Sequence, residues 1–174
     1  MNSIFIDKLN KINTPRPPVW FMRQAGRILP SYQQLKKKYT FDQLMKDSDL
    51  AATVSLLPVK DLGVDAIILF SDILVIPEAL GLNLEFTNKG PIFHNPLRID
   101  NPNKDLNFDC TKLEYIYKNI SNIKNKKNEL PLIGFCGGPL TTFCFMFRGD
   151  LSEKSFNQAI KFLYKYPKQS HKIL

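Results

Sequence analysis

The chain has 174 residues, enough for one ordinary domain with its own core, and its apolar content of 44% is typical of a globular protein. It contains no apolar run of about 18 residues, which a membrane-spanning helix needs, and its first residues lack the basic and apolar regions of a signal peptide. Its three cysteines, with no Cys-x-x-Cys spacing, argue against a disulfide framework and a zinc site, so we expect a reduced, cytoplasmic protein.

The net charge of +8 raises the question of nucleic-acid binding, because basic proteins attract polyanions. Lysines outnumber arginines by 19 to 5 and gather in polar segments such as residues 120–128. The sequence contains no basic stripe interleaved with aromatic residues. We therefore expect no nucleic-acid partner and no membrane partner.

Short helices and strands alternate in the first part of the chain. Helices are expected at residues 4–12, 31–38 and 41–46 and from Ser48 onward, and strands are expected at residues 19–22 and 66–70. Ser48 is a suitable N-cap for its helix. In that helix, Leu50, Val54, Leu57 and Leu62 keep a helical apolar period.

The second part continues this alternation after a long connection. Residues 77–102 are rich in Gly and Pro and are expected to be irregular. Asp109 or Thr111 is expected to open a helix with Leu113, Ile116, Tyr117 and Ile120 on one apolar face. The pattern is completed by a strand at 132–135 and by three helices. These helices are expected at 140–147, at 153–166 after the cap Ser152, and from Pro167 onward. Alternating strands and helices predict a parallel α/β protein.

The segment Val19-Trp20-Phe21-Met22-Arg23-Gln24-Ala25-Gly26-Arg27 joins an apolar run to two arginines with small residues between them. Ligands bind just past the carboxyl ends of parallel strands, and the arginine fork suits carboxylates. The pattern therefore favours a carboxylate-binding turn. The alternative is a strand end with two ordinary solvated arginines.

A carboxylate follows the next expected strand. The apolar run from Gly63 to Phe70 leads into Ser71-Asp72-Ile73-Leu74. Asp72 would then be partly desolvated at the carboxyl end of a buried strand. A helix N-cap explains the same residue equally well.

Three blocks in this order resemble the uroporphyrinogen decarboxylase family. They are Met22–Arg27 (MRQAGR), Phe70–Leu74 (FSDIL) and Gly134–Pro139 (GFCGGP), and the resemblance runs from about Arg16 to the last residue. It implies an α/β fold that is the N-terminal portion of a (β/α)8 TIM barrel. About three of the eight core strands are present here, so residues 1–174 form one incomplete barrel domain.

The resemblance also implies an activity and its residues. Family members are carboxy-lyases of haem biosynthesis, which convert uroporphyrinogen III to coproporphyrinogen III by removing four acetate carboxyls without metal or organic cofactor. Asp72 matches the aspartate that holds the pyrrole N–H groups, and Arg23 and Arg27 match the arginines that bind substrate carboxylates and position or supply a proton. Asp72 and Arg23 are the expected catalytic residues. The remaining implied substrate-binding residues are Gln24, Ala25, Gly26, Phe41 and Phe145.

The chain departs from the family pattern at several of the matched positions. Phe145 stands where the family has a tyrosine, Leu140 replaces a tryptophan, Lys36 an arginine and Ile28 a tyrosine. The family's later serine and histidine contacts have no counterpart, and His94 and His171 are expected to be surface or loop histidines instead.

The element count falls short of a closed barrel. A complete member is about twice this length, and three strands would leave two free edges and an apolar inner face in water. We therefore expect a fragment, either a truncated product or one part of a split enzyme, that is inactive alone. Complete members are homodimers, and a separate C-terminal half is the other expected partner.

Two further functions compete with this interpretation. The chain could be a non-catalytic remnant that binds a tetrapyrrole weakly or not at all. The fold-related cobalamin- or zinc-dependent methyltransferases form another class, but the MRQAGR block favours the decarboxylase.

Overall fold

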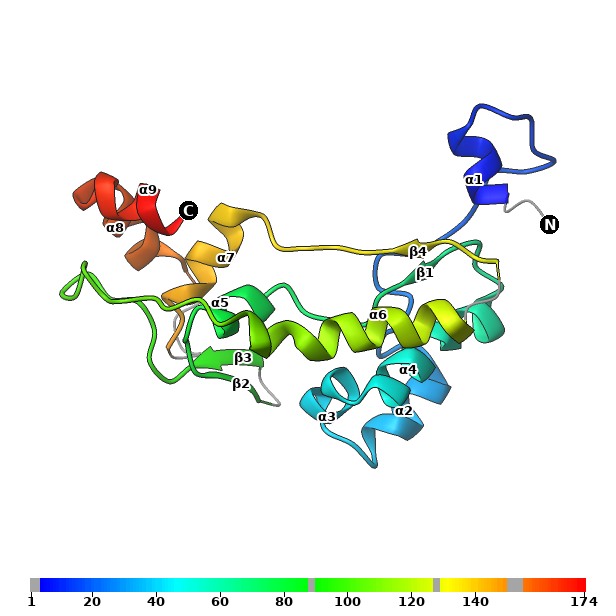
Figure 1. The fold of residues 1–174 in the computed structure, drawn as a ribbon, viewed down its shortest axis with the longest axis horizontal. Coiled ribbons are helices and arrows are strands. Elements are labelled where there is room, and N and C mark those ends of the chain that lie inside the picture. Colours follow the sequence, from blue (N-terminus) through cyan, green and yellow to red (C-terminus); the bar gives the residue numbers. More distant parts are fainter. Residues whose placement is uncertain (1–3, 88–89, 127–128, 150–154) are drawn as a thin grey trace. The chain divides into compact units, whose positions relative to one another are not determined.

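The computed structural model describes residues 4–87, 90–126, 129–149 and 155–174 (Figure 1). The chain divides into two compact units. Unit 1 consists of Met1–Ser71 and Glu114–Phe135, and unit 2 consists of Asp72–Leu113 and Cys136–Leu174. Each unit is described by itself.

Unit 1 contains a short parallel sheet with helices around it. Its elements are α1 (Ile4–Leu9), α2 (Pro30–Lys36), α3 (Phe41–Lys46), α4 (Ser48–Leu62), β1 (Ile67–Ile68), α6 (Glu114–Lys126) and β4 (Leu132–Ile133). Strands β1 and β4 pair in parallel, with Ile67 opposite Leu132 and Ile68 opposite Ile133 (Figure 1). The mixed α/β class is therefore confirmed, although each strand is shorter than predicted.

The core of unit 1 forms where α4 and α6 pack on β1. Ala52, Ile67, Leu69 and Ile123 are its buried members. The predicted apolar face of α6 is wrong at one position, because the side chain of Tyr117 is 63% exposed. Asn119 is buried instead, and its amide donates to the Met45 carbonyl at 2.7 Å. This hydrogen bond to the end of α3 satisfies the amide nitrogen of Asn119, whereas its buried Oδ1 has no hydrogen-bond partner among the described residues.

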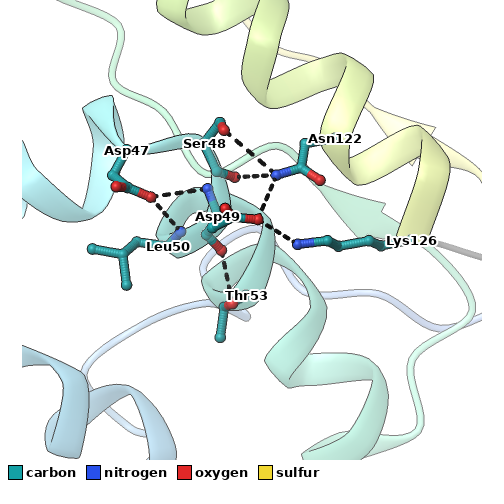
Figure 2. A network of polar contacts seen from close by, with 7 residues as sticks. All are labelled: Asp47, Ser48, Asp49, Leu50, Thr53, Asn122 and Lys126. Atoms are coloured by element: carbon teal, nitrogen blue, oxygen red, sulfur yellow. Dashed lines mark hydrogen bonds and ion pairs between the residues drawn. The ribbon is translucent and has the colours of Figure 1, made fainter.

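The N-terminus of α4 is capped differently from the prediction (Figure 2). Asp47, not Ser48, accepts hydrogen bonds from the Asp49 and Leu50 amides at 2.9 and 3.0 Å. From α6, Asn122 donates to the Ser48 carbonyl at 3.0 Å and Lys126 pairs with Asp49 at 2.6 Å. The prediction failed because Ser and Asp are equally good caps in sequence, and only backbone geometry distinguishes neighbouring positions.

The predicted strand at residues 19–22 is not a strand in the structure. The segment is tied to the entrance of β1 by one backbone hydrogen bond, from the Asp65 amide to the Val19 carbonyl at 2.8 Å. The Val19 amide donates instead to the Asp65 carboxylate at 2.6 Å. Because Pro17 and Pro18 have no N–H groups and Val19 gives its own to a side chain, no continuous ladder forms.

Unit 2 holds helices and an antiparallel hairpin. Its elements are α5 (Val75–Ala79), β2 (Leu84–Thr87), β3 (Gly90–Phe93), the 3-10 helix η1 (Cys110–Leu113), α7 (Pro139–Met146), α8 (Asn157–Lys165) and α9 (Pro167–Ile173). The prediction that 77–102 is irregular is therefore wrong. Gly90 and Pro91 look like breakers, but proline is tolerated in a strand at the edge of a sheet.

The hairpin is held by the core of unit 2. Phe93 is 1% exposed, lies opposite Leu84, and belongs to an apolar cluster with Phe143, Phe147 and Phe162. The predicted helices 140–147 and 153–166 correspond to α7 and α8. The expected cap Ser152 lies outside the described residues.

Candidate active site

The Arg23–Arg27 segment forms a tight turn between residue 21 and α2. The Gln24 amide donates to the Phe21 carbonyl at 3.0 Å, and the Leu29 amide donates to the Gly26 carbonyl at 3.1 Å. A Cβ atom on Gly26 would lie 2.6 Å from the Arg23 carbonyl oxygen. Glycine is therefore required by the turn's own backbone, a reason that differs from close approach to a ligand.

Gln24 fastens this turn to the strand. Its side chain is buried, its Oε1 accepts from the Phe21 amide at 3.1 Å, and its Nε2 donates to the Ala66 carbonyl at 2.9 Å. Both ends of the amide are thus occupied by backbone groups. Gln24 acts on the site by holding the turn, while the neighbouring Ala25 is half-buried on the turn itself.

Arg16 and Asp65 are structural supports that the sequence analysis missed. The guanidinium of Arg16 binds the Asp65 carboxylate with both terminal nitrogens, at 2.6 and 2.7 Å. This hydrogen bond is the main reason that the pKa of Asp65 lies below its usual value. The signal in sequence is a single charged residue inside the apolar run from Gly63 to Phe70.

Arg23 and Arg27 are both exposed. In the described parts of the chain, neither guanidinium takes part in an ion pair. Large apolar side chains lie exposed in the same segment, with Phe21 at 54%, Met22 at 81% and Ile28 at 83% exposed. Two unneutralised guanidinium groups beside exposed apolar surface suit a ligand that carries carboxylates on an apolar body.

An aromatic group stands at the carboxyl end of β1. The Phe70 ring centroid is 5.3 Å from that of Phe41 and 5.9 Å from that of Tyr32. Burial raises the pKa of Tyr32, and the positive charge of Arg27 opposes that change. The Phe70 amide donates to the buried Ser55 hydroxyl at 2.9 Å, which fixes the chain beyond β1. Phe41, Phe70 and Tyr32 thus form one aromatic cluster of unit 1.

Asp72 begins unit 2 and stabilises the turn before α5. Its Oδ1 accepts from the Leu74 amide at 2.8 Å. The carboxyl is half-buried, and burial raises its pKa, which the Leu74 hydrogen bond partly offsets. The alternative that Asp72 is a helix N-cap is therefore wrong, because the N-cap of α5 is Leu74 and no side chain caps that helix; Asp72 stabilises the turn that precedes it. Its approach to the two arginines of unit 1 stays a prediction.

Phe145 lies on α7, where it packs against the core of unit 2. Its ring is 5.3 Å from the Phe156 ring, and the Arg148 guanidinium lies 5.7 Å from its centroid. Its role toward a substrate stays a prediction. Among the other departures from the family pattern, Leu140 is 54% exposed, and Lys36 is also exposed.

Both histidines are exposed, as expected. His94 lies next to the hairpin and pairs with Glu85 at 2.6 Å, and His171 lies on α9. Among the described residues, no three His, Cys, Asp or Glu side chains are grouped to hold a metal ion. No helix in the described ranges is long and apolar enough to cross a membrane.

Comparison with known proteins decides the family. The sequence model of the uroporphyrinogen decarboxylase family matches residues 1–174. The chain belongs to the uroporphyrinogen decarboxylase family. The resemblance found in the three sequence blocks is thereby confirmed.

Curated relatives named uroporphyrinogen decarboxylase include one from Helicobacter pylori strain Shi470, which is 48% identical over 94% of this chain and 49% of its own length. The relative from Helicobacter acinonychis is 46% identical over 98% of this chain and 51% of its own length. The relative from Campylobacter hominis is 44% identical, with 98% and 52% covered. The chain spans about half the length of the curated relatives it matches.

Proposed function

We propose that this chain supplies substrate-binding and catalytic residues for the decarboxylation of uroporphyrinogen III to coproporphyrinogen III. The observation that carries the proposal is the turn at Arg23 and Arg27, where two unpaired guanidiniums stand beside exposed Phe21, Met22 and Ile28. The substrate combines acetate and propionate carboxylates with an apolar macrocycle, so it matches both properties of this surface. The curated relatives carry the name of this activity.

The two arginines bind carboxylates of the substrate in this proposal. Arginine presents a planar fork that can hold a carboxylate by two hydrogen bonds at once. Gly26 and Gln24 keep the two side chains at a constant spacing, because the turn is locked to itself and to Ala66. Ala25 completes the turn, and Phe41 supplies apolar surface against Phe70 beyond β1.

Asp72 acts on the reacting pyrrole. Loss of a carboxyl group as carbon dioxide leaves an electron pair, and protonation of the pyrrole ring supplies the electron sink. The ionised Asp72 carboxylate accepts hydrogen bonds from pyrrole N–H groups and stabilises the positive charge that develops on the ring. The Leu74 amide keeps this carboxylate oriented at 2.8 Å before the reaction begins. Phe145 adds an apolar contact without a hydroxyl group.

The wider architecture is part of the same proposal. Residues 1–174 form one incomplete domain, the N-terminal portion of a (β/α)8 barrel, in which β1 and β4 are two neighbouring barrel strands and the 19–22 segment, although not a strand, lies beside the entrance of β1. The reaction needs no metal or organic cofactor. The protein acts in the cytoplasm without nucleic acid or membrane, and its partners are a second copy of the complete protein or a C-terminal half.

Decarboxylase assays on defined variants test this function. The chain is co-expressed with the second half of the Helicobacter pylori relative, and coproporphyrinogen formation is measured chromatographically. Arg23→Gln and Arg27→Gln should each lower kcat/KM about 10- to 100-fold, since each removes a charge-assisted hydrogen bond of about 1.5–3 kcal/mol. Arg98→Gln, on an exposed arginine of unit 2, is the matched control and should change kcat/KM less than about twofold.

The assay also has an outcome that refutes the proposal. Asp72→Asn should abolish turnover, because the amide cannot supply the negative charge. The 174-residue chain alone should form no coproporphyrinogen. Normal turnover in Arg23→Gln, Arg27→Gln and Asp72→Asn, or no turnover in a co-purified pair of halves, would show that the assignment is wrong.

A further inference from the structure

Helix α2 begins shortly after the Arg23–Arg27 turn and is anchored to the rest of unit 1, where it packs against α4 (Figure 1). The Ser31 hydroxyl donates to the Asp61 carboxylate near the end of α4. On the inner face of α2, Tyr32 is 5% exposed, and its ring centroid lies 5.9 Å from that of Phe70. These contacts fix the first turn of α2, so a side chain that reaches back from this helix has a rigid base.

Gln33 of α2 reaches back to the turn. Its Nε2 donates a hydrogen bond to the Arg27 carbonyl at 2.5 Å. The preceding carbonyl, that of Gly26, accepts instead from the Leu29 backbone amide at 3.1 Å. Any residue except proline could supply that backbone donor, whereas the bond to Arg27 needs a side-chain donor at position 33. The orientation of the Arg27 carbonyl therefore depends on the identity of Gln33.

The Arg27 carbonyl in turn affects where the Arg27 side chain points. Both groups are attached to the same Cα atom, so a carbonyl held by α2 fixes rotation about the Cα–C bond of this residue. The Arg27 side chain is exposed, and its guanidinium takes part in no ion pair in the described ranges. Its direction is thus set mainly from the backbone. Gln24 holds the other part of the turn through the Ala66 carbonyl.

We propose that Gln33 is a positioning residue for Arg27. By holding the Arg27 carbonyl, Gln33 orients the guanidinium for the carboxylates of a tetrapyrrole and makes no contact with the ligand itself. The inference rests on the proposed function, because it takes Arg27 as a carboxylate-binding residue. A side chain that is oriented before binding loses less conformational freedom when the ligand arrives. Loss of Gln33 therefore weakens binding without removing the site.

The sequence of α2 offers a matched control for this role. Gln33 and Gln34 are consecutive, and both are exposed. Successive helical residues point about 100° apart, so the two side chains do not face the same group. Because both positions are exposed, neither substitution opens a cavity in the core. The urea midpoints of Gln33→Ala and Gln34→Ala should therefore stay within about 0.5 M of the wild-type value.

Binding of uroporphyrin III to the 174-residue chain tests the proposal. This oxidised form of the proposed substrate keeps all of its carboxylates, and quenching of Trp20, which is 40% exposed beside the turn, reports binding. Gln33→Ala should weaken binding about 3- to 10-fold, as expected for loss of one neutral hydrogen bond. Gln33→Glu should weaken binding at least as much, because an ionised carboxylate cannot donate to the carbonyl. Gln34→Ala should change the affinity by less than about 1.5-fold.

A double-mutant cycle separates positioning from a general effect on structure. In an Arg27→Gln background, Gln33→Ala should weaken binding by less than about twofold, because the guanidinium that it orients is gone. In the co-expressed pair of halves, Gln33→Ala should raise KM about 3- to 10-fold and leave kcat within about twofold, since Arg27 binds the substrate and does not react. A merely structural role would give equal losses of affinity in both backgrounds.

The outcomes distinguish this inference from the proposed function. Equal losses in both backgrounds, or unchanged affinity and KM in Gln33→Ala, would overturn the role of Gln33 alone. If the wild-type chain did not bind uroporphyrin III, the inference would also fall, while turnover in the co-expressed pair would still support the proposed function. Binding and turnover that Arg27→Gln leaves unchanged would refute the carboxylate-binding role of Arg27 and the inference together.

Discussion

Asp65→Ala is expected to be among the most damaging single substitutions in unit 1, although Asp65 lies outside the substrate-binding residues. The Asp65 carboxylate accepts three hydrogen bonds, two from Arg16 at 2.6 and 2.7 Å and one from the Val19 amide at 2.6 Å. Its side chain is 10% exposed, whereas that of Arg16 is 52% exposed. The two kinds of bond therefore contribute differently to stability.

The magnitude follows from these exposures. An ion pair with one well-solvated partner contributes about 1 kcal/mol at most, and the Val19 hydrogen bond to a shielded charge contributes about 2 kcal/mol. Asp65→Ala should thus lower the free energy of unfolding by about 3 kcal/mol. With a urea m-value of about 2 kcal/mol/M, the midpoint falls by about 1.5 M.

Urea unfolding followed by fluorescence measures this loss. Trp20, the single tryptophan of the sequence, adjoins Val19 and is 40% exposed, so its emission reports release of the segment. Asp42→Ala is the matched control, since Asp42 forms an exposed pair with Lys46 at 2.9 Å. The control should cost less than about 1 kcal/mol. An equal loss in both variants would refute the reasoning.

A second check is how the difference in unfolding free energy between the wild-type chain and Asp65→Ala depends on pH. Arg16 holds the pKa of Asp65 below its usual value, so the stabilisation is present above the unfolded pKa, near 3.9, and is lost as pH falls through the folded pKa. The wild-type chain and Asp65→Ala should therefore differ by a constant amount from neutral pH to about pH 4. Below that pH the difference should shrink.

Four further substitutions test other parts of the structure. Asp72→Asn should raise thermal stability near neutral pH, because burial raises the pKa of Asp72 and so disfavours its charged form. This gain in stability should grow as pH rises from the unfolded pKa of Asp72 through its folded pKa. A gain that occurs only in acid would contradict the prediction. Gly26→Ala should cost about 1–3 kcal/mol in urea unfolding, since its Cβ would lie 2.6 Å from a backbone oxygen; an unchanged midpoint would disprove the tight turn. Asp47→Ala should cost about 1 kcal/mol, and Ser48→Ala clearly less, with the reverse order indicating that Ser48 caps α4.

The sequence alone was sufficient for the family and for most helices. The MRQAGR and FSDIL blocks identify the family because they combine several residue types in a fixed order, and the match over residues 1–174 agrees. Helices α2, α3 and α7 lie within two residues of their predicted bounds, since local signals such as Pro30 and the Thr40–Gln43 capping box define them. The hairpin β2–β3 was not predicted, because burial of Phe93 stabilises it and the local strand propensity of its residues does not.

Within the candidate site, residue types were readable from the sequence but their roles were not. Arg23 and Arg27 stand out because charged residues follow an apolar run. The structure shows that backbone groups occupy the Gln24 amide and that the turn itself requires Gly26. Both roles depend on contacts within the tertiary structure, of Gln24 with Ala66 and of Gly26 with Arg23. Such contacts join residues across 42 positions of sequence or depend on sub-ångström backbone geometry.

The Arg16–Asp65 pair and the exposed Tyr117 also show that the sequence indicates a residue's type and pattern, whereas the tertiary structure decides its contacts. A charged residue in an apolar strand signals only that some partner exists, and the fold alone brings Arg16 to it across 49 positions. The helical period places Tyr117 on an apolar face of α6, but whether that face is covered depends on which chain segments pack there. Periodicity is a local property of the sequence, whereas burial is a property of the complete tertiary structure.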